Sequence, residues 1–187
     1  MRQAHAVGVW TDPALFGFGM EDLRTAVVAQ QGRKGSFPGP CPVLACDLML
    51  SEPQLAAAAQ AGAAGALLSA GVLGDRLPAM VAAAAASALD AVVLCESAAE
   101  LQAAAAAGAR LLAIDTRRSG VEAGLALARE AKEVGVAWDV LVAAGGVADI
   151  TDAWKLRDGG SSPAPPRQPA PPRLLSRAHP WSRRSRY

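Results

Sequence analysis

The stretch ELQAAAAAGARLLAID (Glu100–Asp115) contains the unit from which the chain is built. An alanine-rich run typical of a helix ends at a Gly-Ala turn, and a short apolar run typical of a buried strand follows. QLAAAAQAGA (Gln54–Ala63) repeats the helix and the turn, and it also leads into a run that contains Leu-Leu. Alanine-rich helices resemble one another for trivial reasons, but here the turn residues match as well. The repetition therefore predicts a modular strand–helix protein.

Short apolar runs typical of strands recur along residues 1–158. They are HAVGVWT (5–11), PVLACD (42–47), GALLSA (65–70), DAVVLC (90–95), RLLAID (110–115) and WDVLVAA (138–144). Runs that are apolar almost throughout are typical of parallel strands covered on both faces. Six such βα units predict an α/β protein, either a doubly wound sheet or part of an eight-stranded (β/α)8 barrel.

Helix boundaries are also marked in the sequence. The pairs Ser51 with Gln54, and Ser97 with Glu100, have the spacing of a capping box ahead of an alanine-rich run. Glycine follows the helical runs where a left-handed C-terminal cap favours it, at Gly62, Gly108 and Gly135. These signals predict a helix between successive strands.

The composition narrows the class of protein. The chain has 187 residues, of which 52% are apolar and only 4% aromatic, so the core must consist mainly of small side chains. No uncharged apolar run approaches the roughly 18 residues that a membrane span needs, and no membrane contact is expected. Cys41, Cys46 and Cys95 lack C-x-x-C spacing, and His5 and His179 lie at opposite ends. We therefore expect neither disulfides nor a metal site, and no cofactor.

The C-terminal residues 159–187 differ from the rest. They hold seven of the thirteen prolines and six arginines, with no acidic residue, whereas residues 1–158 carry 12 basic and 17 acidic residues. Repeated proline prevents helix and sheet pairing, so we predict a disordered tail after a barrel domain of residues 1–158. A basic tail can bind nucleic acid. The abrupt change after WKLRDGG favours translated non-coding or out-of-frame sequence instead, and no nucleic-acid partner is expected.

Chemistry in parallel α/β proteins lies at the carboxyl ends of the strands. The six runs deliver Thr11–Asp12, Cys46–Asp47, Ser69–Ala70, Cys95–Glu96, Asp115–Arg117 and Ala144–Gly146 to that edge.

Four segments together resemble one family. They are VWTDPALFGFGMEDLR (Val9–Arg24), CPVLACDLMLSEPQLAAAAQAGAAGALL (Cys41–Leu68), AELQAAAAAGARLLAIDTR (Ala99–Arg117) and LVAAGGVADITDAWKLRDGG (Leu141–Gly160). In order and spacing they are similar to indole-3-glycerol-phosphate synthase, a TIM-barrel carbon–carbon lyase of tryptophan biosynthesis. The resemblance covers nearly all of residues 4–158 and implies strands two to seven of the barrel. The first and last strands are missing, so we expect a fragment, or a partner that closes the open barrel.

The resemblance also implies which residues carried the chemistry. The family closes an indole ring on a phosphorylated anilino-sugar, with loss of carbon dioxide and water. Its catalytic Lys, in a Lys-Asp-Phe motif, aligns with Cys46, and the motif's Asp is retained as Asp47. Its strand-five Glu aligns with Leu94. Losing one positioned acid or base typically lowers a rate by about 10²- to 10⁴-fold, so this chain is expected to be catalytically inactive.

Binding residues are implied in the same way. The family's substrate-contacting Phe aligns with Phe16, and its strand-six Arg aligns with Arg117. Two other positions differ: the family's strand-six Asn is replaced by Asp115, and its strand-seven Glu-Ser pair is replaced by Ala144-Gly145. Arg117 can bind an anion or form a local ion pair with Asp115, and we favour the anion. Gly145 and Gly146 can cradle phosphate, although Gly-Gly is also common at such turns for backbone reasons alone.

Two residues keep alternative interpretations. Asp47 can orient a catalytic group or bond its own turn. Cys46 packs more commonly as a small hydrophobe than it acts as a nucleophile.

The expected function is that of a synthase-like protein of tryptophan biosynthesis. A non-catalytic scaffold, or a pseudoenzyme that binds a phosphorylated small molecule, is the alternative. The resemblance implies a cytoplasmic protein, or one of the plastid stroma in a photosynthetic eukaryote.

Overall fold

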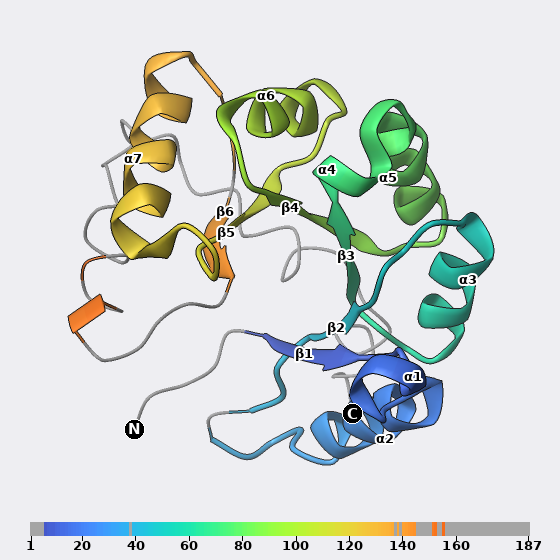
Figure 1. The fold of residues 1–187 in the computed structure, drawn as a ribbon. Helices are drawn as coiled ribbons and strands as arrows, with labels where there is room; N and C mark the ends of the chain where they lie inside the picture. Colours follow the sequence, from blue (N-terminus) through green and yellow to red (C-terminus); the bar gives the residue numbers. More distant parts are fainter. Residues whose placement is uncertain are drawn as a thin grey trace. The chain divides into compact units, whose positions relative to one another are not determined.

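The structure is a computed structural model that describes residues 6–37, 39–136, 138, 140–144, 151–152 and 155 (Figure 1). Its described residues fall into two compact units. The first contains residues 6–67 and 82–91, and the second contains residues 68–81 and the described part of 92–155. The predicted tail, residues 159–187, lies outside the described residues, and the prediction of a single barrel domain over residues 1–158 stays a prediction.

Strands and helices alternate along the chain as predicted. The strands are β1 (Val7–Trp10), β2 (Val43–Cys46), β3 (Gly65–Ser69), β4 (Asp90–Cys95), β5 (Leu111–Asp115) and β6 (Val140–Ala144). The helices are α1 (Pro13–Phe16), α2 (Met20–Gln31), α3 (Glu52–Gln60), α4 (Ala70–Leu73), η1 (Gly74–Arg76), α5 (Leu77–Ala86), α6 (Ala98–Ala106) and α7 (Gly120–Glu133). Each of the six predicted strand runs contains one of these strands. Among the described residues, no helix is both long and apolar enough to cross a bilayer.

Within each unit, neighbouring strands of the chain pair in parallel. In the first unit, Trp10 of β1 lies opposite Cys46 of β2, and β2 pairs with β3. The Asp90 N–H donates to the Ala64 carbonyl (3.0 Å), which places the start of β4 beside the start of β3. In the second unit, β4 pairs with β5 and β5 with β6. The order β1-β2-β3-β4-β5-β6 is that of a (β/α)8 barrel, because a doubly wound sheet reverses direction at a switch point.

One face of each sheet segment is covered by helices. In the first unit, Val43 and Ala45 of β2 are buried together with Leu23 of α2 and Leu55 of α3. The intervening Leu44 and Cys46 are only half-buried. In a strand, alternate side chains point to opposite faces. The face that carries Cys46 is therefore the one that α2 and α3 do not cover.

The helices end in a shared arrangement. After α3, α5, α6 and α7, one N–H bonds a carbonyl five residues back and the preceding N–H bonds a carbonyl three residues back, as between Ala63 and Ala58 and between Gly62 and Ala59. This is the Schellman motif, which requires a left-handed residue just past the helix. Glycine supplies it after α3, α6 and α7 with φ of 89°, 82° and 78°. After α5 the residue is Ala88, the one non-glycine with positive φ in the part of the chain that the structure describes (φ 58°).

Replacing Ala88 by glycine should stabilise the protein by about 1 kcal/mol, because the left-handed conformation strains a residue with a Cβ atom. Ala82→Gly, at an exposed position inside α5, is the matched control. It should destabilise by about 1 kcal/mol, because glycine is a poor helix former. Urea unfolding of both variants measures the difference, and a loss of stability in Ala88→Gly would contradict the account.

Candidate functional site

The carboxyl end of β2 carries Cys46 in a half-buried position. A Cβ atom added to Gly8 of β1 would lie 2.9 Å from Cys46 Sγ, so the thiol lies directly over that glycine. Burial raises the pKa of Cys46 to about 11, although a hydrogen bond with the Val9 backbone opposes part of the shift. A thiol with this pKa is neutral at pH 7, so it does not attract a substrate anion electrostatically.

Asp47 follows Cys46 and bonds the backbone locally. Its Oδ1 accepts the Leu48 N–H at 2.7 Å. This contact matches the alternative in which Asp47 bonds its own turn. A role in orienting a ligand stays a prediction.

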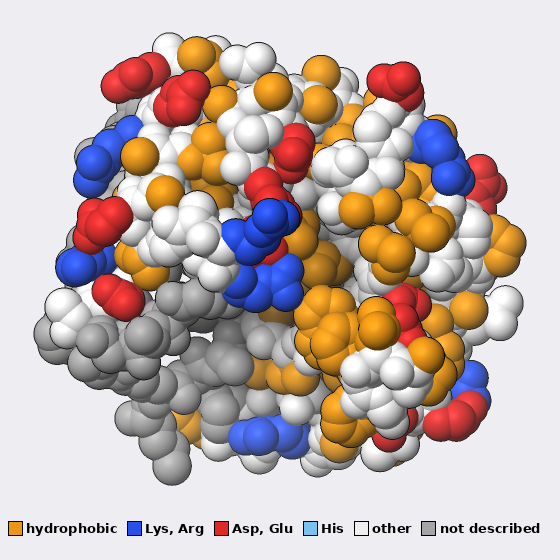
Figure 2. Space-filling model, in the orientation of Figure 1, with side chains coloured by type: hydrophobic (Ala, Val, Ile, Leu, Met, Phe, Trp, Pro, Cys, Tyr) orange, Lys and Arg blue, Asp and Glu red, His pale blue; other side chains and the backbone are white. Residues whose placement is uncertain are grey.

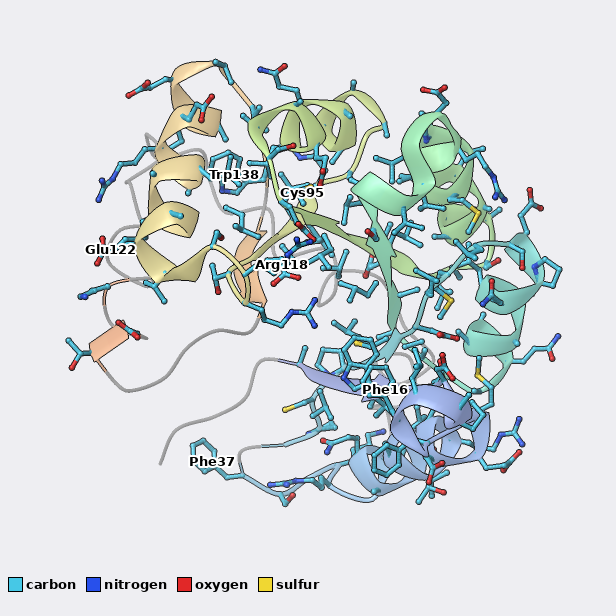
Figure 3. All side chains as sticks on the ribbon, viewed as in Figure 1. Phe16, Phe37, Cys95, Arg118, Glu122 and Trp138 are labelled. Carbon is cyan, nitrogen blue, oxygen red and sulfur yellow. The ribbon has the colours of Figure 1, made fainter. Side chains whose placement is uncertain are left out.

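An aromatic pair lies at the carboxyl end of β1. Phe16, the last residue of α1, stacks on Trp10, with ring centroids 4.3 Å apart and planes inclined by 24° (Figure 3). Asp12 positions the short helix, because its Oδ1 accepts the N–H groups of Ala14 and Leu15. The sequence singled out Phe16 but not Trp10. The period of the strand could have indicated Trp10, since it lies opposite Cys46 on the same face.

In the second unit, Leu94 and Asp115 project from the same face of the sheet. Gly124 of α7 packs so closely that an added Cβ would lie 2.5 Å from Thr116 Cγ2 and 3.6 Å from Ile114 Cγ2, so α7 covers that side of β5. Asp115 alternates to the other side, and so does Ala113, which lies opposite Leu94. Leu94 is half-buried. The structure thus brings Leu94 and Asp115 to one face, with no proton-transfer group at position 94.

Asp115 and Arg117 form a tight ion pair. The Asp115 carboxylate accepts the Arg117 backbone N–H (2.9 Å), its Nε–H (3.0 Å to each oxygen) and its Nη2–H. The carboxylate side chain is 3% exposed and the guanidinium 53% exposed. The Arg117 hydrogen bond lowers the pKa of Asp115 despite the opposing effect of burial, and Asp115 in turn raises the pKa of Arg117.

The pair bears on the two alternatives for Arg117. One side of the guanidinium fork is occupied by Asp115, as the local ion pair requires. Anion binding through the remaining N–H groups stays a prediction. Gly145 and Gly146 lie outside the described residues, so the predicted phosphate cradle is a prediction too.

A second charged pair, which the sequence did not single out as a pair, lies beside the first. Arg118 Nη1 is 3.8 Å from Glu96 Oε2, and both side chains are exposed (Figure 3). The sequence placed Glu96 at the carboxyl end of a strand and gave Arg118 no role. The doubled arginine after a strand end was the available signal. Among the described residues, no group of three His, Cys, Asp or Glu side chains could hold a metal ion.

Comparison with protein families decides the relationship. The family model described as indole-3-glycerol phosphate synthase matches residues 1–163. The chain belongs to the indole-3-glycerol phosphate synthase family. The match confirms the resemblance drawn from the sequence. A search of curated proteins finds no match to the chain.

One solved structure supports the fold. A 3-hexulose-6-phosphate synthase is similar with a TM-score of 0.52 and 18% identity, over 84% of this chain and 88% of that one. A thiamine phosphate pyrophosphorylase from Pyrococcus furiosus is similar with a TM-score of 0.45 and 18% identity, over 83% of this chain and 82% of that one. At these identities the first likeness supports the fold alone and the second is too weak to support an argument.

The Asp115–Arg117 pair should make stability depend on pH. Because the folded-state pKa of Asp115 is lowered, its contribution is present above its unfolded pKa of about 3.9 and is lost as the pH falls through the folded pKa. Asp115→Asn should lose about 1 kcal/mol at pH 7, a modest loss since solvent screens the half-exposed Arg117. Below pH 4 the stability of Asp115→Asn should also decrease less steeply than that of the wild type.

Thermal unfolding between pH 7 and pH 2 measures both effects, with Asp75→Asn, an exposed position in η1, as the control. Parallel curves for the wild type and Asp115→Asn would show that the pair contributes nothing to folding.

Proposed function

We propose that this chain keeps the ligand-binding frame of the indole-3-glycerol phosphate synthase family but not its ring-closing chemistry. Its ligand would be a small molecule that bears a phosphate or a carboxylate. One observation carries the proposal: where the resemblance places the family's Lys and Glu, this chain has the half-buried Cys46 and the half-buried Leu94.

The loss of proton transfer follows from the side chains themselves. With a pKa of about 11, the Cys46 thiol is ionised in only about one molecule in 10⁴ at pH 7, and its neutral form does not attract an anion. An alkyl side chain such as Leu94 neither gives nor takes a proton. When several groups act together, removing them leaves little beyond the catalysis that binding alone supplies. Ring closure and decarboxylation need both a proton donor and a proton acceptor, and these two positions offer neither.

Anion binding is supported by the charges at the end of β5. Arg117 has five N–H donors, and Asp115 takes those on Nε and one on Nη2, so the other side of the fork faces away from the carboxylate. Arg118 lies 3.8 Å from Glu96, which is beyond hydrogen-bond distance. A planar guanidinium suits the oxygens of phosphate and carboxylate.

Two further expectations remain proposals. One is that a partner closes the open barrel, and the other is that the protein is located in the cytoplasm or the plastid stroma.

The first test is turnover. The full chain is mixed with the family's anilino-deoxyribulose phosphate substrate, and the fluorescence of indole-glycerol phosphate is followed. We expect no product above the protein-free control. Turnover that falls in the Asp47→Ala variant would show that the site remains catalytic and would overturn the proposal.

The second test is binding of the same compound by isothermal titration calorimetry. Arg118→Gln should weaken binding by about 3- to 10-fold, because an exposed charge-assisted contact is lost. Arg129→Gln, an exposed position on the outer part of α7, should bind like the wild type. No detectable binding by the wild type would remove the ligand-binding half of the proposal and leave the scaffold alternative.

A further inference from the structure

An exposed apolar patch lies at the carboxyl ends of β1 and β2. We define it by five side chains that are 39% to 74% exposed: Leu15, Phe16, Phe18, Leu48 and Leu50. Figure 2 shows hydrophobic side chains gathered over α1 and the neighbouring end of β2. Large apolar side chains that cluster on a surface indicate a docking site.

The two loops that form the apolar patch leave the sheet side by side. Trp10 pairs with Cys46, and the Thr11 N–H donates to the Cys46 carbonyl at 3.0 Å. Leu15, Phe16 and Phe18 follow within eight residues of Trp10, and Leu48 and Leu50 within four residues of Cys46. The Trp10–Phe16 stack gives this surface an aromatic platform.

The apolar patch is flanked by negative charge. Residues 11–22 and 46–53 contain five acidic residues and no Lys or Arg. The acidic residues are Asp12, Glu21, Asp22, Asp47 and Glu52, of which Glu21 is paired with Arg24 (3.0 Å) and the other four supply the negative charge. An occupant of this surface should therefore combine apolar groups with positive charge.

We propose that the occupant is the proline-rich segment PAPPRQPAPPR of this same chain, residues 163–173. Proline-rich segments form the polyproline II helix, which has three residues per turn and docks on aromatic surfaces with little loss of entropy. In that helix Pro163, Pro166, Pro169 and Pro172 fall on one edge, because they are three residues apart. Arg167 and Arg173, two turns apart, fall together on a second edge.

The two edges match the two parts of the surface. The proline edge complements the aromatic platform and the leucines, and the arginine edge complements the flanking carboxylates. Because the segment and the apolar patch belong to one chain, the effective concentration of the segment at the patch can reach the millimolar range. Weak contacts are then sufficient for docking. The family match ends at residue 163, so all of the segment after Pro163 lies beyond the part of the chain that the family shares.

Limited trypsin digestion of the full chain tests this docking. The bond after Arg167 is protected when the segment is bound. The double variant Leu15→Ser with Phe18→Ser should be cut there at least five-fold faster than the wild type. A second double variant, Val28→Ser with Val72→Ser, removes two equally exposed apolar side chains outside the apolar patch and should be cut at the wild-type rate. Added 0.5 M NaCl should speed cleavage of the wild type, because it screens the charges.

Variants in the tail provide a second test, which does not depend on whether the variants of the apolar patch fold. Arg167→Glu should speed cleavage after Arg173, while Arg186→Glu should not. Equal cleavage rates in all variants would overturn the proposal. A second outcome would also overturn it: light scattering shows a dimer of the wild type, and the Leu15→Ser with Phe18→Ser variant is a monomer with unchanged cleavage of the tail. The apolar patch would then be covered by a second copy of the chain.

Discussion

Parallel pairing of each strand with the next strand in the chain is the constraint on which the rest depends. It requires each right-handed connection to return over one face of the sheet, and α2, α3, α6 and α7 do so with buried Leu, Val and Ala side chains. It also delivers each strand's carboxyl end to the same edge as its neighbour's, as the pairing of Trp10 with Cys46 shows. The loops that carry Phe16, Asp47 and Arg117 are candidates for function for this reason alone.

The return of each helix to the sheet depends on a single backbone geometry. Four helices end in the same pair of hydrogen bonds, and a left-handed residue then reverses the chain into the next strand. Glycine adopts this conformation without strain, and three of the four positions use it. At the fourth, Ala88 holds the geometry because Leu89 and Asp90 beyond it are buried. Burial of the following strand thus imposes a backbone conformation that alanine does not favour.

Cys46 and Leu94 occupy half-buried positions where the family resemblance implies charged side chains. A strand end needs only backbone pairing and a side chain of suitable size, and Cys46 and Leu94 meet those needs as well as charged residues would. An uncharged side chain on a half-buried face also avoids the desolvation penalty of an ammonium or a carboxylate, so folding does not require a charge there. The buried carboxylate of Asp115 is paired with Arg117. Asp115 therefore engages the arginine to which the family resemblance assigns ligand binding.

Much of this molecule was determined by its sequence. The six strands and the capping and turn positions were accessible, because strand and helix patterns and turn glycines act locally. The family was accessible through the resemblance of four segments of the sequence. The strand and helix patterns left a doubly wound sheet and a barrel open, since both share the same local pattern and differ only in which strands pair. The family resemblance implied the barrel, and the strand order of the tertiary structure confirmed it. The tertiary structure alone showed that Arg117 is bound by Asp115, that Trp10 stacks on Phe16 and that Ala88 is left-handed. Each of these depends on how side chains and backbone meet in space, which local sequence patterns do not encode.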